Sequence, residues 1–136
     1  MDVNRDSIDI PYNYGRWLAC AHEIERRALW NAGEKRETSA MRLFTKYAEH
    51  PAKYMSITQH KIQIYEMRLG DRAFWLQRER DKISAKLNEN SLEEVVGARH
   101  LDGRMILGFQ SQMEAFRNKE NNKKDAGGEE NEYIDE

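Results

Sequence analysis

Basic side chains gather in the first half of this chain, where few acidic residues stand near them. Between positions 35 and 68, seven lysines and arginines face only Glu37, Glu49 and Glu66. Cations on helix surfaces can follow a phosphate backbone, through contacts that depend on salt and not on base sequence. The stripe is therefore a candidate nucleic-acid interface. Including two preceding arginines, this basic stripe consists of Arg26, Arg27, Lys35, Arg36, Arg42, Lys46, Lys53, Lys61 and Arg68.

Two tyrosines are interleaved with the basic stripe. Tyr47 and Tyr54 could stack on the bases of a single strand. The alternative is a solubilising surface with two core tyrosines, because basic helix faces are common. The residues alone leave both interpretations open.

Catalytic constellations are missing from the sequence. His22-Glu23 begins like a zinc-protease motif, but Arg26 stands where the second histidine would be needed. The other histidines are scattered, and Cys20 lies near an apolar stripe, where a buried small hydrophobe is expected. We predict no metal site, no cofactor and no enzymatic activity.

Helical periodicity covers most of the chain. We expect a first helix from Pro11 to Trp30, ending at 31–33, and a short second helix capped by Thr38 or Ser39. A third helix should run from Pro51 to Leu69. Gly70 and Asp71 are then expected as C-cap and N-cap before a fourth helix at 72–87. After a turn at 88–90 and a capping box at 91–94, the last helix is expected at 100–118.

Composition fits a small helical core with long polar faces. The chain has 136 residues, of which 39% are hydrophobic and 34% charged, and its mean hydropathy is −0.95. We predict an all-α fold, a compact bundle of about five helices at 11–119, between a flexible segment at 1–10 and a disordered acidic tail at 120–136. No membrane span or signal-peptide core is visible, and the single cysteine suits a reducing cytosol. We therefore expect a soluble, cytoplasmic protein without a membrane partner.

Charge is unevenly distributed. The net charge of the chain is −2, and residues 121–136 carry two lysines against six carboxylates. The first ten residues carry one arginine against three aspartates. The body of the protein is therefore mildly basic, which permits a polyanionic partner without requiring one.

The segment Leu101–Gln112 combines helical spacing of apolar residues with Gly103 and Gly108. Each glycine costs a helix about 1 kcal/mol relative to alanine. A helix that tolerates this cost usually packs closely against another element. We therefore expect both glycines to permit close helix approach.

Several segments together resemble a known family. The matching segments are Tyr14–Ala19, Ile24-Glu25, Ala28, Arg42–Phe44, Pro51 and Leu101–Gln112. They resemble, in order and over about 11–117, the C-terminal part of the large subunit of the type I-C CRISPR Cascade complex. That family also produces this part as a separate small subunit from an internal start, which a chain beginning at Met1 fits. Its motif residues here are Gly15, Arg16, Gly103, Arg104 and Gly108. In Gly15-Arg16 and Gly103-Arg104, a glycine beside an arginine could equally serve helix packing instead of DNA contact, and Arg16 could equally pair with a carboxylate at the edge of the core.

The resemblance implies a non-enzymatic subunit of an RNA-guided complex. Its expected partners are the Cascade large subunit and backbone subunits, crRNA, target DNA with its displaced non-target strand, and another copy of itself. It would bind nucleic acid through the basic stripe and stabilise the R-loop. The alternative is a helical protein-interaction module whose charged faces only keep it soluble.

Overall fold

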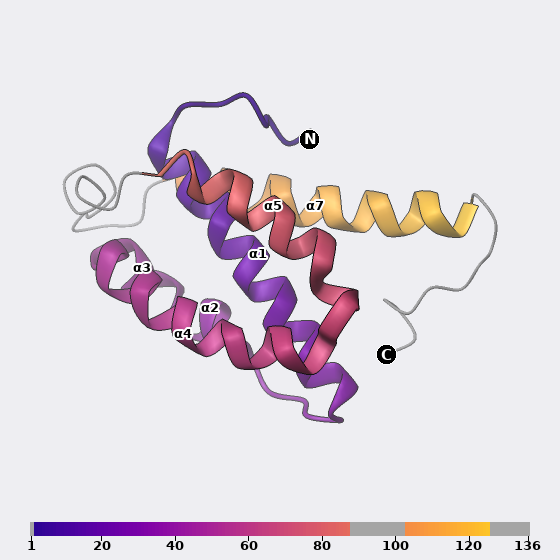
Figure 1. Cartoon of the computed structure of the whole chain (residues 1–136). Coiled ribbons are helices and arrows are strands. Elements are labelled where there is room, and N and C mark those ends of the chain that lie inside the picture. The colour runs from indigo at the N-terminus through magenta and orange to yellow at the C-terminus, as the bar shows by residue number, and fades with distance from the viewer. Residues whose placement is uncertain (1, 88–102, 126–136) are drawn as a thin grey trace.

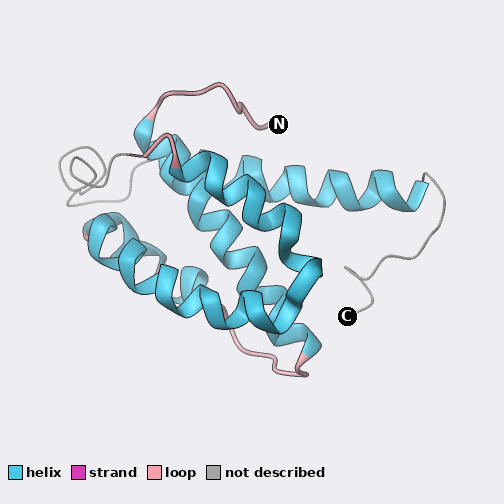
Figure 2. Cartoon of the chain, in the orientation of Figure 1, coloured by secondary structure: helices cyan, strands magenta, loops and turns pink. Residues whose placement is uncertain are grey.

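The computed structural model describes residues 2–87 and 103–125, with side chains to residue 119, and these ranges contain helices and loops but no strand. Figure 2 shows this helical composition. The long helices are α1 (Ile10–Asn31), α4 (Pro51–Leu69), α5 (Phe74–Ser84) and α7 (Gly103–Asp125), as labelled in Figure 1. The short elements are α2 (Ser39–Arg42), α3 (Phe44–Glu49) and the 3₁₀ turn η1 (Gly70–Ala73). The predicted all-α fold is confirmed.

Helix α1 lies at the centre of the bundle. It contacts α2, α4, α5 and α7, and Figure 1 shows it crossing the middle of the molecule. Every side chain from Pro11 to Leu29 is buried or half-buried. Charged residues usually face solvent, but Arg16, Glu23 and Arg27 are buried, because neighbouring helices cover α1 on several sides.

The backbones of α1 and α7 touch at two glycines. A Cβ atom on Gly15 would overlap the carbonyl oxygen of Met105 and lie 2.9 Å from the backbone nitrogen of Phe109. A Cβ atom on Gly108 would overlap the carbonyl oxygen of Tyr12. The missing side chains therefore allow a helix contact that no other residue type permits.

The two glycines of the last helix have different roles. The prediction that Gly108 allows close helix approach is confirmed. For Gly103 it is not supported, because a Cβ atom there would have no neighbour within 4 Å among the described residues. Gly103 is the first residue of α7, ahead of the point where α1 crosses.

Local hydrogen bonds define the ends of α1. The side chain of Asp9 accepts a hydrogen bond from the backbone nitrogen of Tyr12 at 3.1 Å and caps the first turn. At the other end, Gly33 has a φ of 77°, and the backbone nitrogen of Glu34 donates to the carbonyl of Leu29 at 2.9 Å. This is the glycine-terminated Schellman arrangement. The predicted end of the first helix is confirmed.

Two other predicted boundaries differ from the structure. Thr38 caps α2 as expected, but the predicted second helix divides into α2 and α3 at Leu43, whose ψ of 22° interrupts it. Gly70 is the C-cap of α4 as predicted. Asp71, however, lies within η1, and α5 begins only at Phe74.

The last helix is longer than expected. It continues to Asp125, so residues 120–125, predicted as part of a disordered tail, are helical. Residues 126–136, the predicted turn and capping box at 88–94, and positions 100–102 lie outside the described residues. None of the helices in the described ranges is long and apolar enough to cross a membrane.

Residues 2–9 run against the bundle. The backbone nitrogen of Asn4 donates to the hydroxyl of Tyr12 at 2.9 Å, and the side chain of Asn13 donates to the carbonyl of Ser7 at 2.9 Å. The guanidinium of Arg5 donates to Glu79 of α5 at 2.8 Å. These bonds place this segment, which we predicted to be flexible, over α1 and α5.

Candidate nucleic-acid interface

The exposed members of the basic stripe come from the loop after α1 and from α2, α3 and α4. Besides Arg36, which is described below, their side chains belong to Lys35, Arg42, Lys46, Lys53 and Arg68. Lys46 lies 3.6 Å from the carboxylate of Glu49. Exposed ion pairs of this kind contribute little to the free energy of unfolding. The other four form no ion pair with the described residues, so their charges are available to a ligand.

Arg27 does not belong to the interface, and its inclusion in the basic stripe is corrected. Its side chain is only 2% exposed and donates to Glu23 at 2.7 Å. Arg26, which is half-buried, donates to the same carboxylate. Burial acts to raise the pKa of Glu23, but the hydrogen bond from Arg26 and the charges of both arginines outweigh it and lower that pKa. Arg27 is thus a core residue, and the guanidinium of Arg26 is engaged mainly by the same carboxylate, that of Glu23.

Arg36 and Lys61 are partly engaged within the protein. Arg36 donates to the hydroxyl of Tyr65 at 2.9 Å and lies 3.4 Å from the buried carboxylate of Glu25. Lys61 donates to the hydroxyl of Ser39 at 2.7 Å. Glu25 also accepts from the backbone nitrogen of Ser39 at 3.0 Å. Both cations therefore fix the connection from α1 to α2 against α4.

One face of α4 carries three cations and two apolar side chains. They follow one another at intervals of three or four residues, the spacing that aligns side chains along a helix. Ile57 and Ile64 are 46% and 56% exposed, and at 1.5 Å per residue the row extends about 22 Å. We call this row the α4 ridge: Lys53, Ile57, Lys61, Ile64 and Arg68.

The surroundings of the α4 ridge contain little negative charge. The single carboxylate of α4, Glu66, forms an ion pair with Arg80 of α5. The guanidinium of Arg68 lies 5.4 Å from the centre of the Tyr65 ring, and the ammonium of Lys53 lies 5.8 Å from that of Tyr54. These aromatic contacts orient both cations without neutralising them.

The two tyrosines considered for base stacking differ. Tyr47 is buried, and its hydroxyl forms a hydrogen bond with that of Thr58, so it cannot stack on a base. Tyr54 is half-buried and packs against Tyr47 at a ring distance of 5.3 Å. For Tyr47 the structure supports the alternative of a core tyrosine, because its ring fills the core between α3 and α4.

Arg16 is the centre of a buried polar network. Its guanidinium donates to Gln112 of α7 at 2.9 Å and to Asn13 at 3.2 Å, and lies 3.5 Å from Glu79 of α5. Gln112 in turn donates to Glu79 at 3.2 Å. Arg16 therefore joins α1, α5 and α7, and the alternative that it pairs with a carboxylate at the edge of the core is confirmed.

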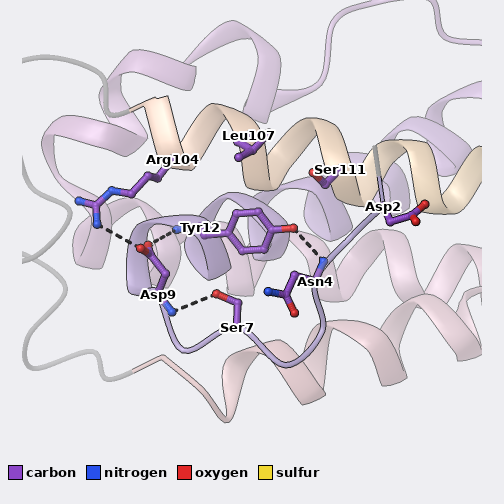
Figure 3. Close-up of a pocket in the computed structure, with 8 residues that line it drawn as sticks. All are labelled: Asp2, Asn4, Ser7, Asp9, Tyr12, Arg104, Leu107 and Ser111. Atoms are coloured by element: carbon purple, nitrogen blue, oxygen red, sulfur yellow. Dashed lines mark hydrogen bonds and ion pairs between the residues drawn. The ribbon is translucent and has the colours of Figure 1, made fainter.

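Arg104 also has a structural contact. It donates to Asp9 at 3.1 Å and so connects α7 to the residue that caps α1 (Figure 3). The pair lies at one end of an open pocket of about 380 Å³ between residues 2–9 and α7. Tyr12, Leu107 and Ser111 form part of its wall, as Figure 3 shows.

His22 is a half-buried link between three elements. Its Nδ1 lies 2.7 Å from the hydroxyl of Thr38, the residue that caps α2, and its ring packs against Phe109 of α7. Burial lowers the pKa of His22 below its ordinary value. At pH values between this lowered pKa and the ordinary value, near 6.5, His22 binds a proton in the unfolded chain but not in the folded chain.

We therefore expect the free energy of unfolding to fall as the pH is lowered from 7.5 to 5.5. In His22→Gln this part of the pH dependence should be lost. Urea unfolding at several pH values measures the slope. The matched control is His60→Gln, since His60 is exposed on α4, and it should keep the wild-type slope. A wild-type slope in His22→Gln would contradict the assignment.

The remaining candidates for chemistry are unreactive or dispersed. Cys20 is fully buried, as predicted, and burial raises the pKa of its thiol. Among the described residues, no three His, Cys, Asp or Glu side chains come together as metal ligands.

Two residues of the buried network were missed in the sequence. The run Glu79–Lys82 alternates in charge, a pattern typical of a solvated face, but Glu79 is buried and only Asp81 and Lys82 of this run are exposed. The signal was available, because Glu79 lies three residues after Leu76 and four before Ile83, on the apolar side of the helix. Gln112 likewise falls on the helical repeat of Met105 and Gly108.

The fold and the cations of the α4 ridge define an all-α bundle protein with a candidate phosphate-contacting surface. Residues 1–117 match the family model described as CRISPR-associated protein (Cas_Csd1). The chain belongs to this CRISPR-associated family, which connects it to CRISPR defence. The match begins ten residues before the range of about 11–117 over which the resemblance was seen. No curated protein and no solved structure gave a match.

Proposed function

We propose that this protein is a non-catalytic structural subunit of a type I-C Cascade complex in the cytoplasm. In this role it contacts nucleic acid without reading its sequence and stabilises the R-loop, including the displaced non-target strand. Its partners are the large subunit, the backbone subunits, crRNA, target DNA and a second copy of the chain. The observation that carries the proposal is the α4 ridge of a chain that belongs to a CRISPR-associated family.

The α4 ridge suits a polyanion for electrostatic reasons. Lys53 and Arg68 are exposed and unneutralised by the described residues, and Glu66 faces Arg80 instead of the ridge. Exposed Arg42 and Lys35 add charge on neighbouring elements. Cations of this kind bind phosphates through counterion release, which needs no base contact.

Such contacts are sufficient for the proposed task. Exchange of a DNA duplex for an RNA–DNA hybrid is nearly balanced in free energy. A few sequence-independent contacts to a separated strand can therefore shift the balance toward the open R-loop. Binding inside the assembly is stronger than binding by the isolated chain, because several weak contacts act at high effective concentration.

The double variant Lys53→Gln/Arg68→Gln tests the α4 ridge. In the assembled complex we expect a loss of target-DNA affinity of about tenfold at low salt. The slope of log K against log salt should become shallower by about 1.4, since each single-strand phosphate contact contributes about 0.7. Filter binding or fluorescence anisotropy over a range of salt concentrations measures both quantities.

The control removes two charges elsewhere. Arg78→Gln/Arg117→Gln lies on α5 and α7, outside the basic stripe, and both side chains are exposed. It should change the affinity less than twofold. An unchanged affinity and salt slope in the ridge variant, with a correctly assembled complex, would rule out the ridge as a nucleic-acid contact.

A second candidate function is a protein-interaction module. It is favoured by the apolar members of the same helix, Ile57 and Ile64, and by Met67, which is 81% exposed. If this is the function, Ile57→Ser/Ile64→Ser should release the protein from the complex in size-exclusion chromatography. The ridge charge variant would then leave DNA affinity unchanged. The nucleic-acid proposal predicts the reverse pattern.

A further inference from the structure

A second cluster of cations surrounds a small pocket outside the basic stripe. It lies between the N-terminal segment, α1 and α5 and has a volume of about 240 Å³. We call it the α5 pocket; its lining residues are Arg5, Arg16, Glu79, Lys82, Ile83 and Lys86.

Three elements bring these residues together. Glu79, Lys82 and Lys86 are spaced by three and four residues and therefore share one side of α5 and the turn that follows it. The ammonium of Lys86 donates to the backbone carbonyl of Arg5 and holds the N-terminal segment beside the pocket. Arg16 reaches the pocket from α1 through the bundle interior.

Positive charge exceeds negative charge in the α5 pocket. Four cations line it against one carboxylate, Glu79. That carboxylate already accepts from Arg5 at 2.8 Å and lies 3.5 Å from Arg16. Lys82 is exposed and forms no ion pair with the described residues. The residues that line this concave, partly enclosed space therefore carry a net positive charge.

We propose that the α5 pocket binds one phosphate group of a nucleic-acid backbone, with Lys82 and Lys86 as its direct ligands and Arg16 as the charge behind it. This inference rests on the proposed function and adds a contact point on a different element. The volume favours a phosphate over a whole nucleotide, because pockets for drug-sized ligands measure about 300–1,000 Å³. Lysine ammonium groups suit a phosphate as mobile point charges.

The position of the α5 pocket gives the contact a distinct role. None of its lining residues belongs to the basic stripe, and four of them come from α5 and the turn after it. A strand held both there and on the α4 ridge has two separated attachment points. Two weak attachments to one strand reinforce one another by effective concentration.

The test compares three assembled complexes with target DNA: Lys82→Gln/Lys86→Gln, the α4 ridge variant and wild type. We expect the α5 pocket variant to bind about fivefold more weakly, with a salt slope shallower by about 0.7, the value for one single-strand phosphate. Arg78→Gln/Arg117→Gln is the charge-matched control and should remain within twofold of wild type. Lys82→Gln alone, whose side chain holds no hydrogen bond among the described residues, should show the same direction of change without loosening the N-terminal segment.

The outcomes separate this inference from the proposed function. Loss of affinity in the ridge variant alone would overturn the α5 pocket and leave the proposed function standing. Loss in the α5 pocket variant alone would support the pocket and remove the α4 ridge from the proposed function. Wild-type affinity in both variants would overturn both.

A second arm identifies the source of the phosphate. Inorganic phosphate is titrated against chloride at constant ionic strength, and the melting temperature of the purified full chain is measured. We expect phosphate to stabilise wild type and not Lys82→Gln, because the shared ligand chemistry is a phosphate oxyanion. Stabilisation by inorganic phosphate together with wild-type DNA affinity in the pocket variant would overturn the backbone assignment and indicate a free phosphate. No stabilisation by phosphate and no change in DNA affinity would overturn the site itself.

Discussion

Replacing Gly108 with alanine should reduce the free energy of unfolding by about 3 kcal/mol or more, the upper range for overpacking. The new methyl group would overlap the carbonyl of Tyr12 in the backbone of α1. A backbone cannot rotate away as a side chain can, so α1 and α7 must separate along their length. Gly15→Ala should have a similar effect from the opposite side, through Met105.

The matched control for this prediction is Gly103→Ala on the same helix. Within residues 2–87 and 103–119, a Cβ atom there has no neighbour within 4 Å, and alanine improves helix propensity by up to about 1 kcal/mol. Gly103→Ala should therefore be neutral or slightly stabilising. Chemical unfolding monitored by circular dichroism measures all three variants. A Gly108→Ala protein within about 1 kcal/mol of wild type would show that the helices do not meet as described, because that is less than a typical overpacking cost.

Glu79→Gln should destabilise the fold by about 3 kcal/mol, near the lower limit for breaking a buried ion pair. The substitution keeps the shape of the side chain and removes only its charge. Arg16, which is buried in α1, would then keep a positive charge without a carboxylate partner. Burial already lowers the pKa of Arg16, which reflects the cost of holding this charge away from water.

Two further variants isolate the role of the charge. Glu49→Gln makes the same chemical change at the weak pair with Lys46 and should cost less than about 0.5 kcal/mol. The double variant Arg16→Met/Glu79→Leu removes both charges and should recover part of the stability lost in Glu79→Gln. Equal stability of Glu79→Gln and Glu49→Gln would contradict the buried network.

The sequence predicted helices better than it predicted their environment. Turn chemistry at Gly33 and capping at Thr38 were local signals, and the structure confirms both. The central position of α1, by contrast, depends on contacts with other helices and has no local signal in the sequence. A helix covered on several sides can bury charged residues when they pair with one another, as Glu23 and Arg27 do, and helical periodicity alone cannot distinguish them from surface residues.

The glycines of Leu101–Gln112 illustrate the same limit. Both Gly103 and Gly108 were expected to permit close packing, and in the part of the chain that the structure describes only Gly108 meets another backbone. Which glycine lies at a helix crossing depends on where the partner helix passes, and that information is carried by α1. Gly15, a motif residue for which packing remained one alternative, proved to be the partner site.

Some features of the candidate interface could likewise be predicted from the sequence, and others could not. Exposed Lys53 and Arg68 could be predicted from charge and spacing, whereas the burial of Arg27 and the bond from Arg36 to Tyr65 depend on tertiary contacts. The α5 pocket was not foreseen, because Arg5, Arg16 and Lys82 are far apart in sequence. They meet only when the N-terminal segment lies over α5.

The most direct test of the proposed function is an electron-microscopy map of the assembled complex with target DNA in an R-loop. We predict nucleic-acid phosphates within ion-pair distance of Lys53 and Arg68 on the α4 ridge. A map in which these two side chains face another protein subunit or bulk solvent, with no nucleic acid beside α4, would contradict it.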